Sequence, residues 1–459
     1  MKGTHDLRHG VLWKQILLFA LPIAATSMLQ QLFNSADVAV VGQFSAQKEL
    51  ALAAVGSTSS IVNLYITIFT GLAVGANVVI ARLIGAEEEG EVRKAVHTSL
   101  VVAVLCGAVL MVVGECLAGP LLRWMDPPEN IIHLARQYLQ IYLLGAIFQM
   151  VYNFEAAILR ANGDTRRPLL CLLLSGGVNV VLNLFFVIVC KLDVAGVAIA
   201  TVISQVISAL LVVRCLMREQ GGVHLELRQL HIWSARLKQI LQVGLPAGFQ
   251  GVLFALSNVV IQSSVNSFQE TVVAGNAASA NIESFVYAAM NAFYQANISF
   301  SSQNYGAGQY DRLRPILLRA QGCVIVTGLV LGGLATLFGH QLLGIYSDSA
   351  AVIDVGMERL AIVCSTYALC GMMDVMVGSL RGLGYSIMPM IVSLLGACAL
   401  RLIWIATIFQ VPRFHTPAMI YWSYPFSWVV TLLAHICCYI WAMRRLRRHL
   451  EENKRLYTL

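Results

Sequence analysis

The stretch RANGDTRRP at residues 160–168 decides the fold, because a related stretch, RGLGYSIMP, occurs at residues 381–389. The matched residues are 221 positions apart: Arg160 with Arg381, Gly163 with Gly384 and Pro168 with Pro389. The same spacing joins Gly85-Ala86 to Gly306-Ala307, and a spacing of 224 joins Pro22 to Pro246 and Asn34 to Asn258. A repeat of this length indicates that the chain arose by duplication.

The apolar composition places both halves in a membrane. Of the 459 residues, 58% are hydrophobic and 12% are charged, about half the charged fraction of a soluble protein. Apolar stretches of about 20 residues, enough to cross a bilayer, recur along the chain. We predict an all-α membrane protein with twelve transmembrane helices in two six-helix bundles, within residues 12–44, 51–81, 95–118, 134–159, 168–189, 195–217, 238–266, 272–302, 316–338, 356–380, 386–410 and 416–443.

The positive charges predict the orientation of these helices. Most of the 31 Lys and Arg residues lie at the termini and in the loops that share a membrane side with them. The positive-inside rule makes this side cytoplasmic, so we expect an inner-membrane protein with both termini inside. Six crossings in each half make the repeats parallel. The predicted domains are an N-terminal bundle (1–217), a cytoplasmic linker (218–237), a C-terminal bundle (238–443) and a basic tail (444–459).

Patterns typical of enzymes and metal sites are missing from the sequence. There is no Walker motif, nucleophile elbow, HExxH or CxxC. The 11 cysteines lie singly or as one adjacent pair, and we interpret them as small apolar residues. The basic run at 444–449 directly follows a span, where it is typical of a topological anchor rather than a nucleic-acid site. We expect no enzyme activity, no cofactor, no metal and no nucleic-acid partner.

Ionisable residues within the spans are the candidates for function, because a charge inside a bilayer is costly. Asp37 is the strongest, since it lies about 35 Å along its helix from Lys14 and thus in the outer half of the membrane. Asn179 and Asn183, one turn apart on the fifth span, could share its depth. We predict an ion-coupling site of Asp37, Asn179, Asn183 and Asn34. The alternative is a structural Asp held by neighbouring amides or hydroxyls.

A second set of candidates lies in the other half and in the polar helices. Glu283, Asp374, Arg401 and Asn258 form a possible second polar site. A buried cation such as Arg401 should have an acidic partner, so an internal ion pair is as plausible there as a transport role. The amides Asn291, Gln295 and Asn153 are candidates for a substrate cavity, although amides also hold helices together. We expect Glu155 to pair locally near Arg160 and reach the cytoplasmic surface.

Taken in order, these residues resemble bacterial members of the multidrug and toxic compound extrusion (MATE) family over nearly the whole chain. The resemblance is carried by Pro22, DVAVVG (37–42), LAAVG (52–56), LIGA (83–86), RANGDTRRP (160–168), NVVLN (179–183), GVAIAT (196–201), LP (245–246), QNYGAG (303–308) and RGLG (381–384). It implies two six-helix bundles around a central cleft and antiport of organic cations against protons or sodium. It also implies that Asp37 matches the first-helix Asp on which coupling depends in many members.

Departures from the family pattern limit what can be transferred. The sodium-coupled bacterial branch has a Glu on helix seven, whereas residues 247–260 contain no carboxylate. The tenth-helix Asp of that branch falls at Cys370, one turn before Asp374. The archaeal branch has an Asp at the position of Asn183. Asp37 is therefore the one coupling carboxylate that transfers, and the choice between proton and sodium stays open.

We predict a secondary active exporter of amphipathic, often cationic, small molecules that works in the lipid bilayer as a monomer by alternating access. One alternative is a lipid-linked oligosaccharide flippase, which shares the duplicated plan. Such a flippase should have a cationic cavity for pyrophosphate, whereas Arg401 is the only cation predicted deep in a span. A membrane-embedded enzyme or a channel is a further alternative that the missing acid–base and metal patterns disfavour. The sequence does not name the substrate.

Overall fold

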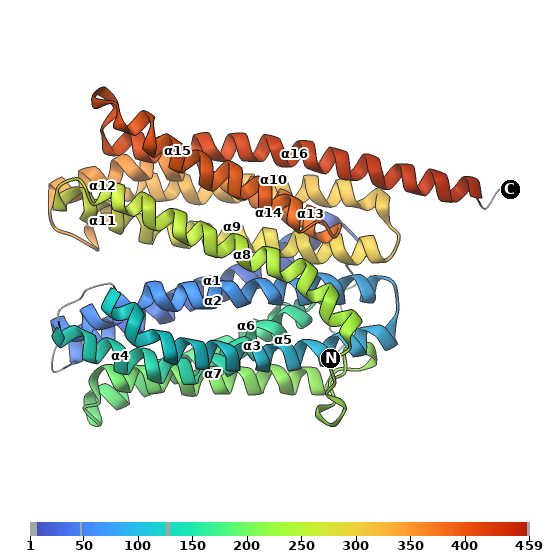
Figure 1. The fold of residues 1–459 in the computed structure, drawn as a ribbon, viewed down its shortest axis with the longest axis horizontal. Coiled ribbons are helices and arrows are strands. Elements are labelled where there is room, and N and C mark those ends of the chain that lie inside the picture. Colours follow the sequence, from blue (N-terminus) through green and yellow to red (C-terminus); the bar gives the residue numbers. More distant parts are fainter. Residues whose placement is uncertain (1–6, 46–47, 125–128, 457–459) are drawn as a thin grey trace. The chain divides into compact units, whose positions relative to one another are not determined.

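The computed structural model describes residues 7–45, 48–124 and 129–456, and the described part contains helices but no strand (Figure 1). The predicted outer loop at 124–130 thus lies largely outside the described residues, as do the last three residues of the predicted tail. The first half contains α1 (Leu12–Phe44), α2 (Lys48–Gly85), α3 (Glu89–Trp124), α4 (Glu129–Leu144), α5 (Ala146–Ala161), α6 (Arg166–Leu184) with its π-helical extension η1 (Phe185–Val189), and α7 (Asp193–Met217).

Two short 3₁₀ turns, η2 (Gly221–Val223) and η3 (Leu227–Gln229), follow α7 and precede the second half. The second half contains α8 (Ser234–Val265), α9 (Glu270–Gly306), α10 (Tyr310–Leu337), α11 (Gly339–Gly344), α12 (Ala350–Val363), η4 (Cys364–Thr366), α13 (Tyr367–Gly382), α14 (Ile387–Ser393), η5 (Leu394–Ala399), α15 (Leu400–Ala406), η6 (Ile408–Gln410), η7 (Pro412–Phe414) and α16 (Pro417–Leu456).

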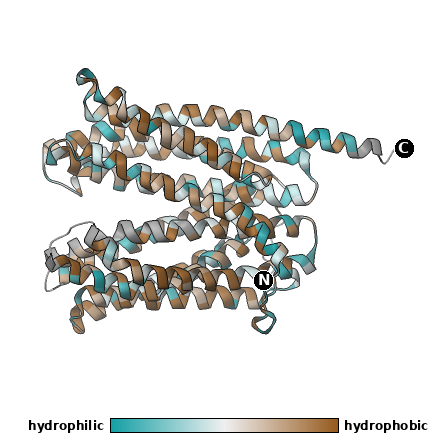
Figure 2. Ribbon diagram, in the orientation of Figure 1, coloured by the Kyte–Doolittle hydropathy of each residue, from teal (hydrophilic) through white to brown (hydrophobic). Residues whose placement is uncertain are grey.

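The helices have the length and surface of membrane spans. Within the described residues, nine helices are long and apolar enough to cross a membrane, and α4 with α5, bent by 47°, makes up to ten. Two of the twelve predicted spans do not meet this criterion. In α2 the apolar part is only Phe69–Gly85, and α9 is rich in Asn and Ser. Figure 2 shows hydrophobic residues along both halves. The chain is an all-α membrane protein.

Large apolar side chains on the outer faces explain this surface. On α3, Leu105, Val109 and Val112 recur at intervals of three or four residues and are 51%, 51% and 57% exposed. Such a stripe on one face of a helix would be unfavourable in water. It is expected where lipid replaces water as the solvent.

The chain divides into two compact units. Unit 1 consists of the residues up to His9, Leu21–Gly251 and Gly306–Gly308, and unit 2 of Gly10–Ala20, Val252–Tyr305 and the residues from Gln309 onward. Two helices therefore contribute long segments to both units, whereas α9 contributes only its last residue, Gly306, to unit 1. Helix α1 passes from unit 2 to unit 1 just before Pro22, and α8 passes from unit 1 to unit 2 a few residues after Pro246.

Glycines bring α2 and α8 together inside unit 1. A Cβ atom on Gly71 would lie 2.0 Å from the backbone nitrogen of Gly248, and one on Gly75 would lie 2.3 Å from the carbonyl oxygen of Ile240. No real side chain tolerates such distances, so the two helices pack backbone against backbone. Small residues allow this close approach in membrane helices, where packing replaces the hydrophobic effect as the driving force.

Candidate functional site

Helices α1, α6 and α7 bring one carboxyl group and three polar side chains together in unit 1. Asn183 Nδ2 donates a hydrogen bond to Asp37 Oδ1 at 2.5 Å, and Thr201 Oγ1 donates to Asp37 Oδ2 at 3.3 Å. Asn183 Nδ2 also donates to Asn179 Oδ1 at 3.2 Å. Asp37 is 6% exposed, and none of the described Lys, Arg or His side chains forms an ion pair with it. The carboxyl is thus buried among neutral polar groups.

The sequence around these residues explains how the helices meet. Gly176 lies one turn before Asn179, and a Cβ atom there would lie 1.9 Å from the ring of Phe33, one turn before Asp37 on α1. The glycine therefore lets α6 approach α1 at this level. Directly beyond Asn183, α6 continues as the π-helix η1. Single π-helical turns of this kind occur frequently at functional sites.

Apolar and aromatic side chains enclose the carboxyl. Val40 and Val41 on α1 pack in one buried cluster with Val197 on α7 and Tyr138 on α4. The Tyr138 ring stacks on Tyr142 with centroids 6.0 Å apart. In such an apolar setting a bound cation or proton must be held by the few polar atoms present.

The polar atoms of this site suit a small hard cation. Asn183 Oδ1 is sealed from solvent and has no hydrogen-bond partner in the described part of the chain. Together with the carboxylate of Asp37, the oxygens of Asn179 and Thr201 complete a set of the oxygen type that hard cations prefer. A proton on the carboxyl is the other possible occupant. The described residues contain no group of three or more His, Cys, Asp or Glu side chains that could hold a metal ion.

Two residues distinguish this observed cluster from the predicted one. Asn34 was predicted as a member but is exposed, and no hydrogen bond joins it to Asp37. Thr201 was not named as a site residue but completes the cluster through Asp37 and through Asn179 Nδ2, 3.4 Å away. Its signal in the sequence was its place at the end of the GVAIAT stretch.

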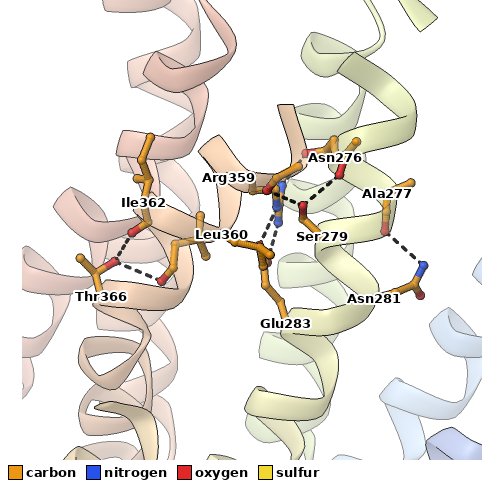
Figure 3. A network of polar contacts seen from close by, with 12 residues as sticks. Asn276, Ala277, Ser279, Asn281, Glu283, Arg359, Leu360, Ile362 and Thr366 are labelled. Atoms are coloured by element: carbon orange, nitrogen blue, oxygen red, sulfur yellow. Dashed lines mark hydrogen bonds and ion pairs between the residues drawn. The ribbon is translucent and has the colours of Figure 1, made fainter. Parts of the chain in front are cut away.

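The four polar residues predicted for the second half do not form one site. Glu283 on α9 binds Arg359 on α12, with Nε to Oε1 and Nη2 to Oε2 both at 2.7 Å (Figure 3). Arg359 Nη1 also donates to Asn276 Oδ1 at 2.6 Å. Asn258, in contrast, is exposed on α8. Arg359 had not been recognised from the sequence, and its only signal was that Glu283 needs a counter-charge.

Close packing of α9 on α12 brings this ion pair together. A Cβ atom on Gly275 would lie 2.7 Å from the carbonyl oxygen of Val352, which shows how closely the two backbones approach. Ser279 Oγ bridges the helices by donating to the carbonyl oxygens of Gly275 and Gly356 at 2.9 and 2.8 Å (Figure 3). Glu283 follows one turn after Ser279 and so faces Arg359.

The expectation that Arg401 has an acidic partner is wrong for the described residues. Its Nε donates to Ser427 Oγ at 2.8 Å. Its guanidinium carbon lies 4.3 Å from the centroid of the Tyr424 ring and 5.7 Å from that of Trp428. The negative faces of aromatic rings attract cations, so rings on α16 take the place that we had assigned to a carboxylate.

The remaining candidates of α9 form a separate polar chain in unit 2. Gln295 Nε2 donates to Asn291 Oδ1 at 3.0 Å, and Asn291 Nδ2 donates to the Tyr287 hydroxyl at 3.4 Å. The Tyr287 hydroxyl also lies near the Asp374 carboxyl. The third amide candidate, Asn153, lies on α5 in unit 1, where its Nδ2 is sealed from solvent and has no hydrogen-bond partner among the described residues.

Glu155 does not reach the cytoplasmic surface as expected. The residue is 0% exposed, and neither carboxyl oxygen has a hydrogen-bond partner in the described part of the chain. Arg160 follows five residues later, which places it about 140° around the helix axis and therefore on another face. Helix α5 is mostly buried, so Glu155 is a further buried acid of unit 1 besides Asp37.

Comparison with known proteins identifies the duplication and the family. The MatE family model matches residues 22–185 and again residues 246–406. The two matches begin 224 residues apart and end 221 apart, which are the two spacings found in the sequence, so the predicted duplication is confirmed.

Individual relatives cover most of the chain. The probable multidrug resistance protein YoeA of Bacillus subtilis is 26% identical over 83% of this chain and 84% of its own length. An FAD transporter of Shewanella oneidensis is 25% identical over 77% of this chain and 78% of its own. A solved structure described as the outward-facing conformation of a multidrug resistance MATE family transporter superposes with a TM-score of 0.88, 23% identity and 98% coverage of both chains. This chain is therefore a transporter of the MatE family.

Proposed function

We propose that this transporter exports small amphipathic molecules and couples their export to the inward movement of a proton or sodium ion through Asp37. The observation that supports this most is the buried carboxyl of Asp37, which has amide and hydroxyl partners but no cationic one in the described chain. Relatives named as multidrug resistance proteins favour small-molecule export. The positive charges favour the cytoplasmic membrane with both termini inside.

The mechanism follows from emptying and refilling one charge. A bound proton or sodium ion neutralises Asp37, and its release leaves a buried charge whose cost depends on how the surrounding helices are arranged. An ion that binds two conformations with different affinity shifts their populations. Helix α1 contains Pro22, which interrupts its hydrogen bonding and gives the helix a place to bend. We propose that alternating access uses this bend, with no cofactor and with the protein as a monomer.

Transport by reconstituted protein tests the role of Asp37. Proteoliposomes would receive an imposed proton gradient or a sodium gradient, and movement of a fluorescent organic substrate would be measured. Asp37→Asn keeps the size of the side chain but cannot release a proton or offer a charge, so gradient-driven transport should fall to background. Asn34→Ala, one turn away on the same helix and exposed, is the matched control and should transport like wild type. Wild-type transport by folded Asp37→Asn would refute the proposal.

The flippase alternative makes a different demand on the structure. A pyrophosphate needs several positive charges that are free of carboxylates, whereas Glu283 neutralises Arg359. Arg401 has no such partner among the described residues. This arrangement favours a ligand with a single anionic group over a pyrophosphate.

A further inference from the structure

We propose that unit 2 contains a binding site for the anionic group of an aromatic ligand, centred on the guanidinium of Arg401. The site would take a carboxylate or a phosphate on a planar aromatic body, as part of a transported molecule. The inference extends the proposed function by naming a substrate class, but it concerns binding and does not depend on Asp37 or on any ion gradient.

The first ground is that Arg401 is buried without a counter-charge. The residue is 4% exposed, and its one hydrogen bond to a described residue goes from Nε to the neutral hydroxyl of Ser427. The Nη1 and Nη2 atoms donate to none of the described side chains or carbonyls. Neither atom is sealed from solvent. These two donors therefore remain available to a ligand. They form the half of the guanidinium fork that binds a carboxylate or phosphate bidentately.

Arg359 provides an internal comparison for this argument. Its guanidinium also lies over the Tyr424 ring, 5.6 Å from the centroid, on the ring that Arg401 contacts at 4.3 Å. Arg359 donates two hydrogen bonds to Glu283 and one to Asn276, so its charge is neutralised and its nitrogens have partners (Figure 3). Two arginines thus share one ring but only one carboxylate. The cluster retains one positive charge, and that charge is at Arg401.

The surroundings of Arg401 favour an aromatic ligand. Trp428 packs against Tyr424 with centroids 5.8 Å apart and against Tyr367 at 5.4 Å. Tyr367 in turn lies 6.4 Å from Tyr287, which is 37% exposed. A series of rings therefore extends from the guanidinium to an exposed tyrosine of the same unit. Aromatic rings stack on one another at these separations, so a planar ligand could lie along the series with its anionic end at Arg401.

Two dyes with the same ring system and opposite charge test the site. Fluorescein is an anion at neutral pH and rhodamine 6G is a cation, and both contain a xanthene ring. Binding to purified full-length protein in detergent would be measured by fluorescence anisotropy. In Arg401→Gln, fluorescein should bind at least about tenfold more weakly, which corresponds to about 1.4 kcal/mol, while rhodamine 6G should bind as before. Arg401→Lys keeps the charge and should retain a preference for fluorescein at reduced affinity.

The controls separate this site from coupling and from folding. Asn34→Ala, exposed on α1 and outside both sites, should bind fluorescein like wild type. Binding is measured without any gradient, so this proposal and the coupling role of Asp37 can fail independently. Equal weakening of both dyes in Arg401→Gln, or unchanged fluorescein binding, would overturn the anion site. If Arg401→Gln does not fold, Arg401→Lys decides, because loss of the preference for fluorescein in a variant that keeps the charge contradicts the proposal. Absence of fluorescein binding to wild type would contradict it as well.

Discussion

The two units differ in the sign of the charge that they bury, although they come from one duplicated sequence. Among the described residues, the buried acidic and basic side chains of unit 1, histidines aside, are all acids: Asp37, Glu155 and Asp164. Those of unit 2 are three arginines and one acid: Arg359, Arg381, Arg401 and Glu283. Duplication thus preserved the helices while the chemistry of the two interiors diverged.

Matched positions show where the divergence took place. At the spacing of 224, Asp37 corresponds to Ile261, and at the spacing of 221, Asn183 corresponds to Trp404. In the other direction, Arg401 corresponds to Val180. Each polar site therefore has an apolar counterpart in the other half. The comparison indicates that the two halves do not have the same polar site at equivalent places.

The largest change in stability is expected from breaking the ion pair of unit 2. Glu283→Gln leaves Arg359 buried without its carboxylate, and loss of one partner of a buried pair costs about 3 to 5 kcal/mol. Thermal unfolding in detergent should therefore occur at a clearly lower temperature. The double variant Glu283→Gln with Arg359→Met removes the stranded charge and should recover most of the loss. A Glu283→Gln variant as stable as wild type would show that this pair does not hold α9 to α12.

A smaller change, of opposite sign, is expected at Glu155 in unit 1. Its carboxyl is buried, and neither oxygen has a hydrogen-bond partner within the part of the chain that the structure describes. An unsatisfied buried polar group costs about 1 to 3 kcal/mol. Glu155→Leu should therefore raise the unfolding temperature. Glu155→Gln keeps two polar atoms at the same place and serves as the control, with little gain expected. Destabilisation by Leu but not by Gln would reveal a partner for this carboxyl.

The smallest stability change is expected at Arg401, and it completes the contrast between Arg359 and Arg401. No carboxylate is stranded when Arg401 is removed, so Arg401→Gln should lose the cation–π contacts, about 0.5 to 2 kcal/mol, and one hydrogen bond to Ser427. Its unfolding temperature should stay closer to wild type than that of Glu283→Gln. If the order of the two variants is reversed, Arg401 has a structural role comparable to that of the ion pair.

The sequence predicted those features that depend on distance along a helix. The rise per residue placed Asp37 and Asn183 at one depth, and the two side chains form a hydrogen bond. Features that depend on the rotation of a helix about its axis were not predictable. Asn34 lies on the same helix as Asp37, but its side chain is exposed. Glu155 is buried, although it was expected to reach the surface.

The side chains that contact Glu283 and Arg401 from other helices were also not predictable from the sequence. Burial of Glu283 and Arg401 was expected, and their charges suggested pairing within one half. Glu283 pairs with Arg359 because α9 and α12 approach each other closely. The rings of α16 that contact Arg401 depend likewise on how α15 lies against α16. A single sequence does not specify how α9 packs on α12 or how α15 packs on α16, so neither set of contacts could be predicted.

The divided membership of α1 and α8 has a consequence for any attempt to separate the halves. A fragment cut within the connector after α7 would carry Gly10–Ala20, which belongs to unit 2, and would lack the first part of α8, which unit 1 requires for the glycine contact with α2. Neither half of the gene therefore encodes a self-sufficient folding unit. Split versions of this transporter would have to be co-expressed as complementary pieces, and the covalent connector is dispensable only if both pieces enter the membrane together.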